Sequence, residues 1–185
     1  MSVEQVHEQK ETLSIDILIP GHAARTETSL FEHSRKKLIE REGGRCFISN
    51  MTADELGHPL EAHHHPIERC FAEIVDWERF AKDCKAGHWG PYAQAFDWDK
   101  FFEGAKHVVV KAAETPLHSD VTRLVPNDPY LFVDDMTVNG LLLGKQFHTQ
   151  KDQGIHMTTY PDWIIQKYAI EGYRMTPTEV IHHDD

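Results

Sequence analysis

Three consecutive histidines, His63, His64 and His65, stand at the end of a short segment that reads as a β-strand. Side chains alternate in direction along a strand, so His63 and His65 would share one face and His64 would take the other. Neutral imidazole is a common metal ligand, and a histidine with a near-neutral pKa can also take a proton from water. The run therefore predicts either a metal site with a catalytic base or a solvent-exposed histidine tract.

A second segment with chemically useful residues lies near the other end of the chain. It begins at Asn139, continues through an apolar stretch to His148, and is followed by Gly154-Ile155-His156. An amide, two imidazoles and the earlier histidine run are the residue types from which metal-dependent hydrolases build their sites. This second segment is what favours the metal-site interpretation of the first.

Together the two segments resemble the two halves of the HNH endonuclease motif. Leu60-Glu61-Ala62-His63-His64 is similar to the first half, and the stretch from Asn139 to His148 is similar to the second. Phage-type members of the family look most similar, because the chain continues in their manner after His148 and because the stretch from Ser34 to Phe47 is also similar. The similarity covers two blocks, about 28–66 and 134–172, separated by an acidic insertion at about 67–133.

The resemblance implies a fold and a set of roles. The fold would be α+β, with a ββα-metal core, a mostly helical insertion and flanking helices in one domain over 1–185. His63 and His148 would bind one divalent metal ion, with His156 as a candidate further ligand. His64 would be the general base for phosphodiester hydrolysis in nucleic acid, and the Asn139 side-chain carbonyl would orient its ring. The frame with His64 as ligand and His65 as base stays open.

The ligand types bear on the metal. An imidazole-rich site should accept zinc, nickel or manganese more readily than magnesium. Many HNH proteins also carry a structural zinc ion on two Cys-x-x-Cys pairs. The corresponding positions here are Cys46, Ser49, Gly144 and Phe147, which cannot make a four-coordinate zinc site. We therefore expect side-chain packing in its place, with Phe147 filling the space.

The charge of the chain bears on its partners. The 185 residues carry a net charge of -11, and the acidic excess lies in the middle of the chain. That balance argues against strong non-specific DNA binding, which depends on Lys and Arg near phosphates. DNA is nevertheless the partner that the resemblance implies, and five basic residues could contact it: Arg35, Lys36, Lys37, Arg41 and Arg45. The alternative is a catalytically degenerate HNH-like module that binds nucleic acid, or a protein through the acidic insertion.

The sequence also bears on location. No apolar run approaches the length of a membrane span, and the first residues lack the pattern of a signal peptide. Three scattered cysteines, Cys46, Cys70 and Cys84, fit reduced thiols better than a disulfide framework. We therefore expect a cytoplasmic protein with no membrane association, in the host cytoplasm if a phage encodes it.

Hydrophobic periodicity and turn residues predict the elements that must position these residues. Helices are expected from Thr28 or Ser29 to Gly43-Gly44, over 67–85, from Asp97 or Asp99 towards Val110, and over 161–171. A strand at 46–48 is expected to form a hairpin with a strand at 60–64, and a further short strand is expected at 15–19. Residues 52–59 and 115–129 should be loops, 130–133 a strand or turn, and 139–151 a turn leading into a helix.

Overall fold

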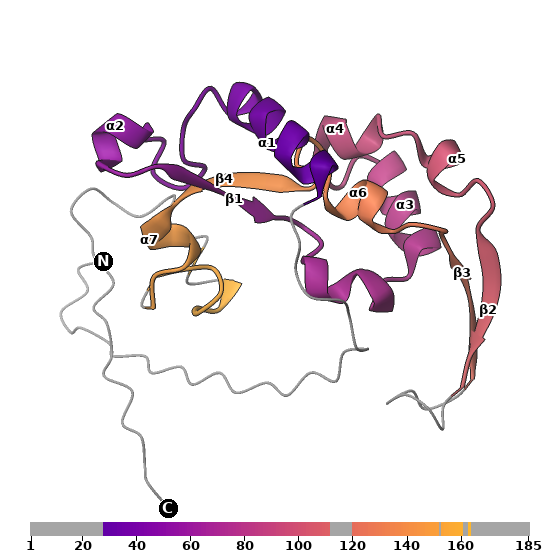
Figure 1. The fold of residues 1–185 in the computed structure, drawn as a ribbon. Coiled ribbons are helices and arrows are strands. Elements are labelled where there is room, and N and C mark those ends of the chain that lie inside the picture. The colour runs from indigo at the N-terminus through magenta and orange to yellow at the C-terminus, as the bar shows by residue number, and fades with distance from the viewer. Residues whose placement is uncertain (1–27, 112–119, 152, 161–162, 164–185) are drawn as a thin grey trace, which may run out of the picture.

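The computed structural model describes residues 28–111, 120–151, 153–160 and 163. The predicted strand at 15–19 and most of the predicted helix at 161–171 lie outside this part of the chain. Helices and small antiparallel sheets are combined in an α+β fold, as expected (Figure 1). In chain order the elements are α1 (Ser29–Arg41), α2 (Ala53–Leu56), β1 (Leu60–His64), the 3-10 helix η1 (Arg69–Ile74), α3 (Trp77–Lys85), α4 (Gly90–Gln94), α5 (Trp98–Phe101), β2 (Lys106–Val110), β3 (Val121–Val125), α6 (Tyr130–Val133), β4 (Gly140–Gly144) and α7 (Lys145–His148).

Helix α1 begins and ends close to where the sequence predicts. The Thr28 side chain accepts a hydrogen bond of 3.1 Å from the Phe31 amide, which satisfies a free N–H at the helix start. Beyond the C-cap Glu42, Gly43 and Gly44 have φ angles of 60° and 67°. Glycine adopts such positive φ angles without strain because it lacks a Cβ. One face of α1 packs against β4 through the buried Leu38.

Strand β1 has the predicted bounds, but its partner is not the predicted one. It pairs antiparallel with β4, so that His63 lies opposite Leu141 and His64 opposite Gly140 (Figure 1). Every residue of β4 is buried. The expected hairpin with 46–48 is wrong: these residues form a turn, closed by a hydrogen bond of 2.9 Å from the Cys46 amide to the Met51 carbonyl. A leucine-rich strand offers β1 more burial than this short segment can.

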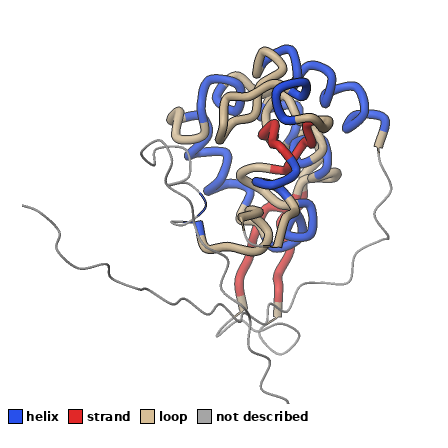
Figure 2. Tube along the Cα trace, turned by 90° about the vertical axis from the view of Figure 1, so that its left-hand side faces the viewer, coloured by secondary structure: helices blue, strands red, loops and turns tan. Residues whose placement is uncertain are grey.

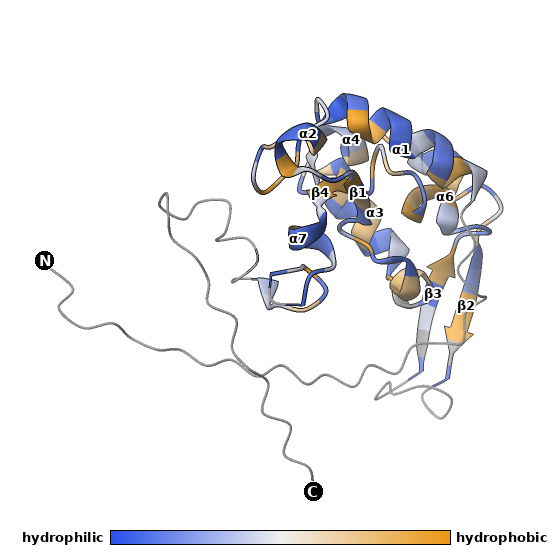
Figure 3. Ribbon diagram, turned by 60° about the vertical axis from the view of Figure 1, so that its left-hand side comes forward, coloured by the Kyte–Doolittle hydropathy of each residue, from blue (hydrophilic) through white to orange (hydrophobic). Residues whose placement is uncertain are grey.

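The 67–133 segment is less helical than predicted. The helix expected over 67–85 is split, because Asp76 starts a new helix by accepting a hydrogen bond from the Arg79 amide. The helix expected towards Val110 stops after Phe101, and Gly104 with φ 72° turns the chain into β2. Strand β3 replaces part of the expected loop, and β2 and β3 form a hairpin that projects from the remainder of the molecule (Figure 2). Exposed Val108 and Val109 give it an apolar surface (Figure 3).

Three other segments differ from the sequence predictions. The loop expected at 52–59 contains α2, held by a capping box in which Thr52 and Glu55 exchange hydrogen bonds. Residues 140–144, expected within a turn, form β4, and only the following residues are helical. The segment at 130–133, expected to be a strand or turn, is a short helix.

Buried apolar side chains form two separate clusters. The first surrounds β4 and includes Leu38, Cys46, Leu142 and Phe147. The second is made by the 67–133 segment and is mainly aromatic, with Trp77, Phe80, Trp98, Phe101 and Phe132 in mutual ring contact. No helix in the described ranges is long and apolar enough to cross a membrane. His63, His64 and His148, discussed below, lie on β1 and α7, which pack against one another beside the first cluster.

Candidate metal centre

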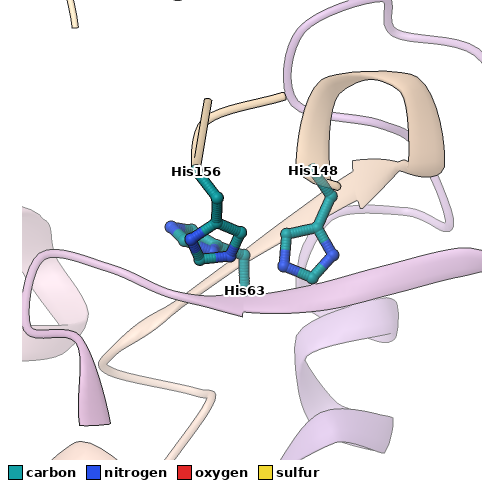
Figure 4. A group of neighbouring side chains, drawn as sticks. All are labelled: His63, His148 and His156. Atoms are coloured by element: carbon teal, nitrogen blue, oxygen red, sulfur yellow. The ribbon is translucent and has the colours of Figure 1, made fainter. Parts of the chain in front are cut away.

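Three histidines from distant parts of the chain converge on one point. His63 is on β1, His148 ends α7, and His156 follows in the next loop (Figure 4). One ring nitrogen of each lies within 4.8 Å of a ring nitrogen of the other two. The ring centroids are 4.9 to 5.2 Å apart. Three neutral imidazoles at this spacing could bind one metal ion, and the sequence predicted all three as ligands.

The pairing of β1 with β4 explains this convergence. Strand β4 runs directly into α7, so the register that places His63 opposite Leu141 also carries His148 back to β1. The next turn is fixed by a hydrogen bond of 3.0 Å from the Ile155 amide to the Phe147 carbonyl, which returns His156 to the same place. Gly154 is needed there, because a Cβ on it would meet the His148 carbonyl at 2.7 Å.

His63 is the buried member of the group. Only 3% of it is exposed, whereas 40% of the His156 side chain is exposed. Burial, and then the nearness of His148 and His156, lowers the pKa of His63 to about 2. The ring is therefore neutral at any physiological pH, and a neutral ring has the lone pair that a metal ion requires.

Carboxylates flank the three histidines on two sides. Glu61 is two residues before His63 on β1, and its Oε2 lies 2.7 Å from His148 Nδ1. A carboxylate in this position fixes a metal-binding imidazole and leaves its other nitrogen available to the ion. Glu68 Oε1 lies 3.2 Å from His63 Nε2 and 3.8 Å from His156 Nδ1. Side chains two residues apart on a strand share a face, so the sequence could have placed Glu61 on the same face as His63. No sequence pattern pointed to Glu68.

His64 lies outside the three-histidine group and beside a buried carboxylate. Its Nε2 is 3.4 Å from Asp134 Oδ1, and its ring stacks on Phe31 with centroids 5.5 Å apart. This nitrogen makes no hydrogen bond to any residue that the structure describes. The contact with Asp134 is therefore electrostatic.

Asp134 is itself held by several groups. Thr28 Oγ1 donates to its Oδ2 at 3.0 Å, and Arg69 Nε donates to its Oδ1 at 3.1 Å. Burial would raise the pKa of Asp134, but the contacts with His64, Arg69 and Thr28 together lower it below its ordinary value. Asp134 thus remains charged next to His64. Sequence reasoning missed this residue, because an aspartate in a short loop carries no motif.

Asn139 occupies a different place from the one that the resemblance implied. Its side chain is fully buried, and its hydrogen bonds go to the main chain: Oδ1 accepts from the Ile67 amide, and Nδ2 donates to the carbonyls of Ile67 and Val133 at 2.8 and 2.9 Å. The side chain thus joins the turn after β1 to the segment before β4. Within the described part of the chain the Asn139 side chain makes no hydrogen bond to the His64 ring, and Asp134 lies beside that ring instead.

His65 packs against the 67–133 segment and is not among the residues that line the cleft described below. Its ring contacts Trp89 edge to face, with centroids 6.0 Å apart, and burial lowers its pKa. The sequence left open whether His64 or His65 would be the base. His64 lines the same cleft as the three histidines, whereas His65 packs on the 67–133 segment.

The candidate residues line one cleft of about 360 Å³. His63, His148 and His156 stand in its wall together with His64, Asp134, Arg69 and Glu68. Arg69 stacks on Tyr130, with its Cζ 4.6 Å from the ring centroid, and supplies a positive charge. A metal position, an imidazole outside it and a guanidinium thus face a common space.

The positions that could have held a structural zinc ion are packed as expected. The Gly144 amide donates a hydrogen bond of 3.2 Å to Cys46 Sγ, and Cys46 and Phe147 are both buried in the first cluster. Phe147 thus lies in the same buried cluster as Cys46, in keeping with the expected packing. Trp163 belongs to the same cluster; it is fully buried and donates a hydrogen bond of 2.8 Å to the Phe147 carbonyl.

Comparison of the chain with models of known protein families, with curated proteins and with solved structures gives no match.

Proposed function

We propose that this protein is a metal-dependent nuclease of the HNH type that hydrolyses phosphodiester bonds in DNA. The observation that carries the proposal is the convergence of His63, His148 and His156 beside His64 in one cleft. Separate segments of the chain contribute these residues, and a solvent-exposed histidine tract would not bring them together.

Local structure around the site supports the same family. Strands β1 and β4 pair antiparallel and lead directly into α7, an order consistent with a ββα-metal core. The contact between Cys46 and Gly144 supports it independently, since the two segments that carry a zinc brace in many family members meet here through packing.

Six residues of the cleft have a role in the proposed reaction. His63, His148 and His156 would hold the ion, which when bound would offset negative charge on the phosphate and on the leaving oxygen. His64 would accept the proton of the attacking water, and because its Nε2 faces Asp134, Nδ1 is the nitrogen available for that proton. Asp134 would stabilise the resulting imidazolium, and the Arg69 guanidinium would contact a phosphate oxygen.

The electrostatics of the site favour a reaction that needs a cation. Glu61, Glu68 and Asp134 surround the histidines, and Arg69 is the positive side chain that lines the cleft. A phosphodiester would be repelled from these carboxylates unless an ion were bound. Five basic residues could contact DNA. Lys36 and Lys37 are exposed on α1, whereas Arg41 donates hydrogen bonds to the carbonyls of Thr137 and Gly140.

Cleavage of a supercoiled plasmid tests the proposal. Protein stripped of metal should be inactive, and addition of manganese, zinc, nickel or magnesium should restore nicking with at least one of them. His148→Ala should lose both metal binding and nicking, because it removes a ligand. If wild-type protein binds metal but cleaves neither supercoiled, linear nor single-stranded DNA, the chain is the catalytically degenerate module, with the acidic 67–133 segment as the place to seek a protein partner.

A further inference from the structure

Glu68 approaches two of the three converging histidines, His63 and His156, whereas Glu61 approaches the third, His148. A single oxygen of Glu68, Oε1, lies 3.2 Å from His63 Nε2 and 3.8 Å from His156 Nδ1. The side chain is about three-quarters buried, with 24% exposed, and it lines the cleft. Glu68 is held at this point because it is the N-cap residue of η1, directly after the turn that the Asn139 side chain fixes.

These distances are those expected between neighbouring ligands of one ion. With metal–ligand bonds of about 2.0 to 2.2 Å, two atoms bound to the same ion lie roughly 3 to 3.6 Å apart in octahedral or tetrahedral geometry. The contact of Glu68 with His63 falls in that range, and the contact with His156 is slightly longer. Glu68 is not part of the group whose ligand atoms all lie within 4.8 Å of one another, so its side chain would turn towards the ion on binding. Glu61 differs, because it bonds the Nδ1 of one imidazole and so leaves the other nitrogen for an ion.

We infer that Glu68 is the fourth protein ligand, bound through Oε1, which makes the site three imidazoles and one carboxylate. The inference rests on the metal site of the proposed function, and it assigns the two flanking carboxylates different tasks: Glu68 binds the ion and Glu61 orients His148. A carboxylate is a harder ligand than imidazole and carries a charge. It would therefore raise affinity for manganese more than affinity for zinc, compared with three histidines alone.

Calorimetric titration of the full-length, metal-stripped protein with manganese chloride and, separately, zinc chloride tests this assignment. Glu68→Gln keeps the size of the side chain but removes the charged ligand, so manganese should bind about 100-fold more weakly and zinc should lose clearly less. Glu61→Gln should weaken both metals by a similar factor, roughly 10- to 100-fold, because it disturbs one imidazole. Glu103→Gln, an exposed change distant from the cleft, should alter neither.

A second variant protects the test against misfolding of the first. Glu68→His offers another imidazole, so it should favour zinc over manganese more strongly than the wild type does. Titrations of His148→Ala give the background of weak binding elsewhere on the chain. Glu68 is not a ligand if Glu68→Gln binds both metals like the wild type, or loses the same factor for each. If wild-type protein binds neither metal more tightly than His148→Ala, the metal site itself fails, and the proposed function fails with it.

Discussion

Asp134 Oδ1 lies 3.4 Å from His64 Nε2, and the same carboxylate accepts hydrogen bonds from Thr28 and Arg69. Thr28 is the N-cap of α1, Arg69 begins η1, and Asp134 directly follows α6. One buried carboxylate thus fixes His64 relative to three elements of the fold. A ring anchored in this way has one nitrogen directed away from solvent and one available for a reaction.

Substitution of Asp134 tests whether this anchoring serves catalysis. Asp134→Asn should lower kcat for plasmid nicking by roughly tenfold or more, yet by less than the roughly 10²- to 10⁴-fold loss expected when the base itself is removed. KM and the metal dissociation constant should change little, because Asp134 contacts none of the three metal-binding histidines. Asp99→Asn, at a fully exposed side chain, is the control. A drop in metal affinity as large as the drop in kcat would make Asp134 a structural residue only.

Asn139 should matter to stability more than to the chemical step. Asn139→Ala removes three hydrogen bonds and leaves buried main-chain groups without partners, so the free energy of unfolding should fall by about 3 kcal/mol. Urea unfolding of metal-free protein measures this. Asn127→Ala, at an exposed residue with one hydrogen bond, should cost under about 1 kcal/mol. Normal stability with strongly reduced nicking would instead favour the ring-orienting role that the sequence resemblance implied.

Residues within continuous segments were the ones that the sequence located best. Strand β1 and helix α1 have local signals, the alternation around His63 and the cap at Thr28, and both form where expected. Strand β4 was missed because its three consecutive leucines fit a helix as well as a fully buried strand. The pairing of β1 with β4 was therefore missed as well, because that pairing depends on burial by residues far away in the chain.

The three converging histidines could be singled out because their segments resemble a family motif, whereas the neighbouring carboxylates have no such signal. Asp134 contacts His64, 70 residues away in sequence, and Glu68 contacts His63, 5 residues away. Asn139 shows the converse case. Its position was marked, but its partners are main-chain groups, and main-chain hydrogen bonds of this kind follow from the path of the turn at His65 to Ile67 and not from residue types.

Purified protein should hold one tightly bound metal ion and no structural zinc at Cys46. The Cys46 thiol is buried and accepts a hydrogen bond from the Gly144 amide. The other brace positions are Ser49, Gly144 and Phe147, which lack sulfur, so they cannot complete a four-coordinate zinc site. Mass spectrometry under native conditions should therefore give one ion per chain, and His148→Ala should abolish it while Cys46→Ser retains it. A bound ion that persists in His148→Ala and is lost in Cys46→Ser would contradict this assignment.

Cys84 reports on the closure of the second cluster. Burial, together with the nearby charge of Asp83, raises the pKa of this thiol to about 12. The thiolate is the reactive form, so at pH 9.0, the ordinary pKa of a cysteine thiol, Cys84 in the folded protein should resist iodoacetamide. Half-buried Cys70 should react faster, and both should react equally in urea, as read by peptide mass spectrometry.

The same shift has a consequence for stability. Because the folded thiol ionises only near pH 12 and the unfolded thiol near its ordinary value of 9.0, the contribution of Cys84 is complete below pH 9 and is lost as the pH rises towards 12. Cys84→Ala should therefore show a shallower decline of the free energy of unfolding across that interval than the wild type. An identical decline in both proteins would mean that the thiol is not shielded from solvent.

The adjacent residues His64 and His65 offer a matched pair that separates base from ligand. His64→Ala should bind metal like the wild type, since the three converging histidines remain, but should nick DNA roughly 10²- to 10⁴-fold more slowly. His65→Ala removes a ring that packs on Trp89, so it should lower stability modestly and leave the nicking rate of the folded protein within a fewfold of wild type. Calorimetry with zinc and single-turnover nicking on the same preparations measure both properties. If His65→Ala is the variant that binds metal and fails to cleave, the base is His65, and the contact between His64 and Asp134 serves the fold alone.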